Sequence, residues 1–136
     1  MTEFVLDTSM IMSWCFNDET DDYSDFVLAM LSTSEALTPS ICPFEVANVL
    51  LVAERRGRLT EADTSRFISL LESLPIHIDL ESPSRFIADL LAVGRKYGLS
   101  SYDAAYLELA MREGLSLATM DEALRFAAGK CGINLV

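Results

Sequence analysis

Short apolar runs that suit β-strands alternate along this chain with longer segments in which apolar residues recur every three or four positions. The strand-like runs cover residues 3–7, 35–40, 76–80, 116–120 and 133–136. The helical patterns cover residues 9–16, 22–33, 43–56, 61–73, 83–97, 101–113 and 121–130. Strands that alternate with helices usually form a mostly parallel sheet. The sequence therefore predicts an α/β fold whose central sheet has about five short strands, with helices on both faces.

Local signals mark where several of these helices begin and end. Thr60 opens the segment TEAD, in which acids follow a capping residue, as is typical of a helix N-terminus. Glycine stands just after three predicted helices, at Gly57, Gly98 and Gly114, where helices commonly stop. With 136 residues and neither a linker nor an internal repeat, the chain is expected to form one domain, residues 1–136.

Several classes of protein are disfavoured by residues that are scarce or missing. The three cysteines (Cys15, Cys42 and Cys131) have no C-x-x-C spacing, and His77 is the one histidine, which argues against a zinc site. No G-x-S-x-G segment supports a Ser-His-Asp triad. No apolar run approaches the roughly 20 residues that cross a bilayer. The first residues, MTEFVLD, lack the basic start of a signal peptide, so we expect a cytoplasmic protein without membrane contact.

The net charge of −11 argues against a protein that holds nucleic acid on a broad basic surface. Such a chain can still bind nucleic acid through bound cations, or bind a basic partner. The acidic segment NDETDD, residues 17–22, lacks the alternation, the central glycine and the closing glutamate of an EF-hand loop. We interpret it as a solvated loop.

Four acids stand out by their positions relative to the predicted elements. Asp7 ends the first strand, Glu45 and Asp103 lie in the first turns of helices, and Asp121 follows the fourth strand. Each has a purely structural interpretation, as a helix cap or as a complement to a helix dipole. Ligands of such sheets bind at the carboxyl ends of the strands, where the four acids can gather. Clustered carboxylates repel one another and favour hard cations such as Mg²⁺ or Mn²⁺, which activate water against phosphodiesters.

Four segments resemble the motifs of PIN-domain ribonucleases of the VapC-type toxin family, from bacterial toxin–antitoxin systems. They are VLDTS (5–9), PFEVANVL (43–50), LSSYDAAYLELA (99–110) and LATMDEAL (117–124), in the family's order. The resemblance implies a PIN-like fold and an endoribonuclease that depends on Mg²⁺ or Mn²⁺. It implies that Asp7, Glu45, Asp103 and Asp121 are catalytic and that Asp7, Asp103 and Asp121 hold metal. It also implies an RNA substrate, a homodimer, and an antitoxin with a basic inhibitory segment.

The family's helper positions match Thr8, Asn48 and Thr119. Asn48 lies three residues after Glu45 on one helical face, where its amide can hold the Glu45 carboxylate or a metal-bound water. Thr119 lies two residues before Asp121 on the same face of an extended segment, which suits a supporting role. Ordinary backbone hydrogen bonding is the alternative for Asn48 and Thr119.

Three arginines, Arg55, Arg56 and Arg58, are candidate RNA contacts. They follow the Glu45 helix by some three turns, on the order of 15 Å at 1.5 Å per residue, so they would serve RNA at the other subunit of a dimer. The alternative is a solvated helix end whose cations complement the helix dipole.

Three other functions fit part of this pattern. A phospho-acceptor receiver domain needs adjacent acids after the first strand and a lysine after a late strand, but Asp7 stands alone and the lysines, Lys96 and Lys130, follow no strand. Phosphatases of the haloacid-dehalogenase type carry D-x-D where this chain has D-T-S. A PIN-like scaffold that only binds a partner is the third alternative, which the presence of all four acids disfavours.

Overall fold

The computed structural model describes residues 2–16, 18, 21–80 and 83–136. These residues form four strands, β1 (Thr2–Leu6), β2 (Ser34–Pro39), β3 (Ile76–Asp79) and β4 (Ser116–Ala118). They also form seven helices, α1 (Thr8–Cys15), α2 (Asp22–Met30), α3 (Cys42–Arg55), α4 (Glu61–Ser73), α5 (Pro83–Tyr97), α6 (Ser101–Glu113) and α7 (Glu122–Lys130). Each helix falls on a segment that the sequence predicted as helical.

The sheet is parallel throughout, with strand order β3-β2-β1-β4. The prediction of a mostly parallel sheet is therefore confirmed, with one strand fewer than the five expected. The last predicted strand, residues 133–136, makes only an isolated bridge between Leu117 and Leu135. The backbone of Leu117 donates to the Asn134 carbonyl at 2.9 Å and accepts the Val136 N–H at 3.0 Å, so the segment lies beside β4 without forming a ladder.

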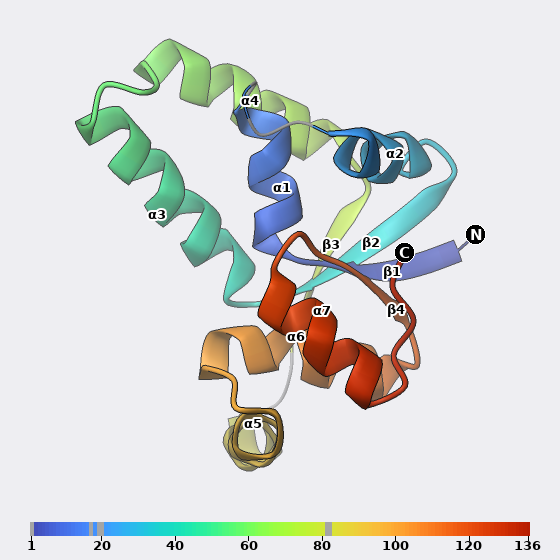
Figure 1. Ribbon diagram of the computed structural model, residues 1–136. Helices are drawn as coiled ribbons and strands as arrows, with labels where there is room; N and C mark the ends of the chain where they lie inside the picture. The colour runs from blue at the N-terminus through green and yellow to red at the C-terminus, as the bar shows by residue number, and fades with distance from the viewer. Residues whose placement is uncertain (1, 17, 19–20, 81–82) are drawn as a thin grey trace.

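Helices cover both faces of the sheet. Figure 1 shows α1 to α4 on one side of the strands and α5 to α7 on the other. Helix α6 packs on β1 and β2, and its residues 104–110 are all buried. Because β1 is covered on both faces, Phe4, Val5 and Leu6 are all buried, which explains why this strand is a continuous apolar run.

The predicted helix boundaries are present as capping geometry. The Thr60 hydroxyl accepts a hydrogen bond from the Asp63 N–H at 3.1 Å, and the Asp63 carboxylate accepts one from the Thr60 N–H at 2.9 Å. This reciprocal pair is the capping box that begins α4. Gly57, Gly98 and Gly114 all have positive φ, the left-handed conformation that glycine adopts most readily.

Arg112 anchors the far end of α6. Its guanidinium donates to Glu108 Oε1 at 2.8 Å and to Asp79 Oδ2 at 2.9 Å. Glu108 is buried, so its carboxylate needs this opposite charge, and Asp79 ends the edge strand β3. The ion pairs therefore join α6 to the edge of the sheet.

Other predictions concern loops, cysteines and membranes. In the predicted loop 17–22, residues 17, 19 and 20 lie outside the described residues, and Asp21 caps α2 by accepting a hydrogen bond from the Ser24 N–H at 2.7 Å. Among the described residues, none of the three cysteines forms a disulfide. Among the helices of the described residues, none has both the length and the apolar character needed to cross a membrane.

Candidate active site

Two of the four acids leave neighbouring strands at the same edge of the sheet. Strands β1 and β4 pair at Leu6 and Ala118, and the Asp7 N–H donates to the Ala118 carbonyl at 3.0 Å. Asp7 then begins α1, and Asp121 begins α7 two residues beyond Thr119. The parallel register therefore places Asp7 beside Thr119 at the carboxyl edge, where sheets of this class bind ligands.

Asp7 is buried, with 5% of its surface exposed. Although it occupies the N-cap position of α1, its side chain makes no capping bond. Its Oδ2 atom instead accepts hydrogen bonds from the hydroxyls of Ser9 and Thr119, each at 2.6 Å. Burial raises the pKa of Asp7, the two hydroxyls oppose that rise, and the charge of Glu45 adds to it. Asp7 is thus a buried acid that two hydroxyl groups hold in place, and it is not a surface charge.

Glu45 reaches the same edge from the first turn of α3. Its Oε1 atom accepts a hydrogen bond from the Tyr106 hydroxyl at 2.5 Å and lies 3.1 Å from the Thr8 hydroxyl. The two hydroxyls also lie 2.6 Å from each other. Burial raises the pKa of Tyr106 far above its usual range, so its hydroxyl keeps its proton and acts as a donor.

Asp103 lies in the first turn of α6, which Ser100 caps by accepting a hydrogen bond from the Asp103 N–H at 3.2 Å. The pKa of its half-buried carboxyl is raised to about 6, first by burial and then by the charges of Asp121, Asp7 and Glu45. The charges of all three other acids therefore act on Asp103.

Asp121 serves as a helix cap as well as a member of this cluster. Its Oδ1 atom accepts a hydrogen bond from the Leu124 N–H at 2.9 Å, which begins α7. The structural interpretation of Asp121 is thus correct, and it coexists with the electrostatic effect of this carboxylate on Asp103.

The helper residues differ in what they contact. Thr119 is fully buried, and its hydroxyl binds Asp7 and accepts the Asp121 N–H at 3.0 Å. Thr8 binds Glu45, as described above. Asn48 is exposed on α3, and within the described residues no hydrogen bond joins it to Glu45.

Sequence reasoning missed Ser9 and Tyr106. Ser9 is the last residue of the quoted motif VLDTS, and its hydroxyl also accepts the Met120 N–H at 2.9 Å, which links α1 to the segment before α7. Tyr106 lies within the quoted segment LSSYDAAYLELA, three residues after Asp103 and therefore on the same helical face. That spacing is the signal that was available for Tyr106.

Comparison with known proteins identifies the fold family. The PIN domain family matches residues 4–130, nearly the whole chain. The chain belongs to the PIN-domain family. It is 30% identical to ribonuclease VapC3 of Pyrobaculum aerophilum over 122 residues, which are 90% of this chain and 92% of that protein. This relationship places it among the VapC-type PIN domains, and the receiver and haloacid-dehalogenase alternatives are wrong.

Solved structures agree with this assignment. The crystal structure of PAE2754 from Pyrobaculum aerophilum matches with a TM-score of 0.69 and 25% identity, covering 93% of this chain and 86% of that one. A toxin–antitoxin complex from Klebsiella pneumoniae matches with a TM-score of 0.62 and 18% identity, covering 87% and 86%. The second likeness concerns the fold alone.

The donor set of this PIN domain suits a hard cation in chemistry and in charge. Its four carboxylates supply only oxygen ligands. Burial, and then the charges of the other three, raise the pKa of Asp103, and a cation would relieve that repulsion. Among the side chains that the structure describes, however, no three of His, Cys, Asp or Glu are already grouped as a metal site. Asp7 Oδ2 is held by hydroxyls instead. We therefore expect metal binding to draw the carboxylates of this PIN domain together.

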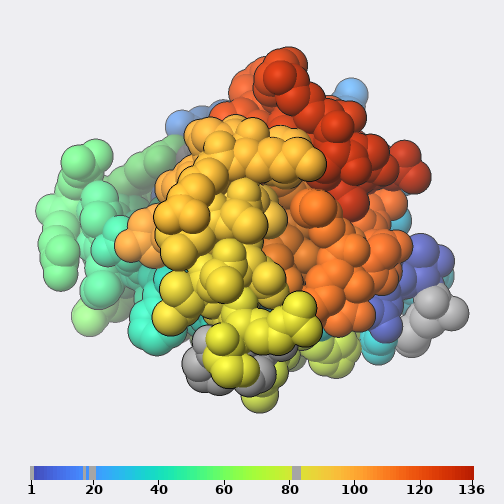
Figure 2. All heavy atoms as spheres, turned by 90° about the horizontal axis from the view of Figure 1, so that it is seen from below, coloured from blue at the N-terminus to red at the C-terminus, as the bar shows by residue number. Residues whose placement is uncertain are grey.

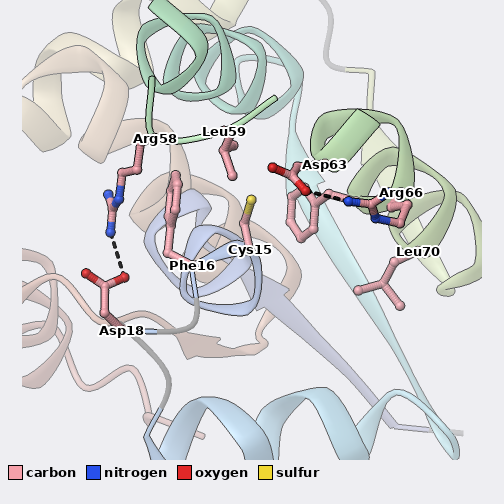
Figure 3. A pocket seen from close by; sticks show the side chains of 9 residues that line it. Cys15, Phe16, Asp18, Arg58, Leu59, Asp63, Arg66 and Leu70 are labelled. Atoms are coloured by element: carbon pink, nitrogen blue, oxygen red, sulfur yellow. Dashed lines mark hydrogen bonds and ion pairs between the residues drawn. The ribbon is translucent and has the colours of Figure 1, made fainter. Parts of the chain in front are cut away.

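The three predicted RNA-binding arginines lie away from this edge. Arg55 and Arg56 are exposed at the end of α3. Arg58 contacts Asp18 at 2.7 Å and stacks on the Phe16 ring, 3.8 Å from its centroid. Figure 3 shows this pair at a pocket of about 620 Å³ that also receives side chains from α4. None of the four acids lines this pocket, so its size does not mark it as the reactive centre of this PIN domain.

The raised pKa of Asp103 predicts how the stability of the metal-free PIN domain depends on pH. Its pKa is about 6 in the folded protein, against 3.8 normally, so the folded state binds the proton more tightly. The resulting stability is present at low pH and is lost as pH rises through about 6. In chelator, lowering the pH from 7 to 5 should raise the melting temperature of the wild type more than that of Asp103→Asn. The same change in melting temperature in both proteins would show that the charges of the other acids do not act on Asp103.

Proposed function

We propose that this PIN domain is a Mg²⁺- or Mn²⁺-dependent endoribonuclease and the toxin of a toxin–antitoxin pair. The observation that carries the proposal is the shared electrostatics of Asp7, Glu45, Asp103 and Asp121 at the carboxyl edge of the sheet. The 30% identity to a protein named ribonuclease VapC3 supports RNA as the substrate. Cleavage of RNA by the purified protein in Mg²⁺ or Mn²⁺, and its loss in chelator, tests the proposal.

In this proposal, Asp7, Asp103 and Asp121 hold the metal. When bound, such an ion supplies the Lewis acidity that lets water attack a phosphodiester at neutral pH. Ser9 and Thr119 orient Asp7 through its Oδ2 atom. Thr119 also holds the backbone of Asp121, so one hydroxyl links two of the metal-binding acids.

Glu45 acts as a base in the same proposal. Its Oε1 atom is engaged by the Thr8 and Tyr106 hydroxyls, which leaves Oε2 to accept a proton from the attacking water. Asn48 lies one helical turn further along α3 on the exposed surface, where it would meet RNA or solvent.

The antitoxin we propose carries a basic segment that enters the acidic centre. The net charge of −11 and the mutual repulsion of the four acids favour an arginine or lysine there when metal is absent. The likeness to a toxin–antitoxin complex from Klebsiella pneumoniae is consistent with such a partner. The cytoplasm, predicted from the sequence, is the compartment where this activity would act.

We also propose that the protein is a homodimer and that Arg55, Arg56 and Arg58 serve RNA across the dimer. Helix α5 lies on the outer surface, as Figure 2 shows, and presents Ile87 (67% exposed) and Leu91 (48% exposed) one turn apart. Apolar residues at this spacing form a stripe that a second copy can cover.

Light scattering at micromolar concentration should therefore report twice the mass of one chain. Replacing Ile87 with Asp should give monomers with an unchanged circular dichroism spectrum, because a charge would be buried at the interface. Arg85→Asp, an exposed position on another face of α5, is the matched control and should stay dimeric. A wild-type protein that is monomeric would contradict the dimer.

A further inference from the structure

A buried tyrosine holds the Glu45 carboxylate from inside the protein. Tyr106 has no exposed surface, and its hydroxyl donates to Glu45 Oε1 at 2.5 Å. The Thr8 hydroxyl lies 3.1 Å from the same oxygen and 2.6 Å from the Tyr106 hydroxyl, to which it can donate. Hydrogen bonds to an ionised acceptor are roughly twice as strong as neutral ones, so the bond from Tyr106 is a firm restraint on the carboxylate.

The restraint matters because Glu45 is otherwise free to move away. Glutamate has several rotatable side-chain bonds, and the Glu45 side chain is only partly buried. Asp7 and Asp103 lie close to Glu45. Burial raises the pKa of both aspartates, and the charge of Glu45 adds to that rise. Repulsion from these acids would therefore swing an unrestrained Glu45 toward solvent.

Tyr106 is well placed to supply a fixed anchor. Its ring packs in the hydrophobic core, so its two side-chain torsions are set by packing. Asp103 lies three residues earlier on α6, on the same helical face. One rigid helix thus carries both an acid of the centre and the hydroxyl that orients Glu45.

We infer that Tyr106 is a positioning residue that sets the orientation of Glu45, which leaves Oε2 as the oxygen available to the reaction. The inference rests on the proposed ribonuclease function for its effect on rate, but the restraint itself is a property of the metal-free protein. It assigns to Tyr106 the support of Glu45 that the sequence pattern had suggested for Asn48.

Tyr106→Phe tests this inference because it removes only the hydroxyl and keeps the ring. We expect kcat for RNA cleavage to fall by about tenfold to a hundredfold, as is typical when a supporting hydrogen bond is removed, with KM unchanged. Tyr102→Phe is the matched control, since it makes the same chemical change one turn away on α6, where the side chain is 57% exposed. Its kcat should equal that of the wild type.

A second measurement needs no cleavage. The carboxyl ¹³C resonance of Glu45 in the metal-free protein should shift in Tyr106→Phe and stay in place in Tyr102→Phe, because only the first loses the hydrogen bond. An unchanged resonance together with an unchanged kcat would overturn the inference. A fall in kcat that merely follows a lower melting temperature would assign Tyr106 a structural role and also overturn it. A wild-type protein that cleaves no RNA would defeat the proposed function instead, while the resonance still decides whether Tyr106 holds Glu45.

Discussion

Replacing Asp7 with asparagine should lower the rate of RNA cleavage by orders of magnitude while the protein stays folded. Asp7 is buried at the carboxyl edge, and two hydroxyls donate to its Oδ2 atom. Asparagine has nearly the same shape, and its amide oxygen can still accept these hydrogen bonds. The substitution therefore removes the negative charge that the proposed metal needs and changes little else.

The experiment compares purified wild type, Asp7→Asn and Asp25→Asn in Mg²⁺ and in Mn²⁺. Asp25 is exposed on α2, so its replacement controls for the loss of one negative charge. Sequencing the RNA ends would locate the cleavage sites. Asp7→Asn protein that cleaves at the wild-type rate would refute the assignment of Asp7. A wild type that binds a partner but cleaves nothing in either metal would favour the PIN-like scaffold.

The second large effect is expected in stability. Mg²⁺ that binds only the folded protein stabilises it by RT ln(1 + [L]/Kd), which is roughly 2.7 kcal/mol at a hundredfold excess over Kd. The wild type should show this gain over chelator as a higher melting temperature. Asp7→Asn should gain much less because its ligand set is short by one charge.

In chelator, Asp7→Asn should have the higher melting temperature of the two proteins. Burial and the charge of Glu45 raise the pKa of Asp7, so the ionised carboxylate destabilises the metal-free protein at neutral pH. Asp7→Asn removes that charge and should melt at a higher temperature than the wild type. Thermal unfolding of both proteins, each in chelator and in Mg²⁺, checks both expectations. Equal melting temperatures in all four conditions would mean that Asp7 belongs to no charge cluster and binds no metal.

Much of the fold could be predicted because its signals are local. The apolar run at residues 3–7 predicted a strand, and β1 forms there with Phe4, Val5 and Leu6 buried beneath α6. Thr60 and Gly57 marked helix boundaries because capping depends on residues within one or two turns. Residues 133–136 were predicted as a strand and form only a bridge, because pairing depends on a partner segment elsewhere in the fold as well as on local sequence.

The acids were identifiable from the sequence, but their supporting contacts were not. Asp7 and Thr119 are far apart in the chain, as are Glu45 and Tyr106, and each pair meets only through strand register and helix packing. Asn48 was the natural partner for Glu45 by spacing on one helix, yet the hydroxyls that reach Glu45 come from Tyr106 on α6 and Thr8 on α1. By itself, the sequence determined where the helices and four of the five predicted strands form and which acids stand at their ends, since these depend mostly on neighbouring residues. Only the tertiary structure decided which hydroxyls hold those acids and how strongly their charges interact, because both depend on distances across the fold.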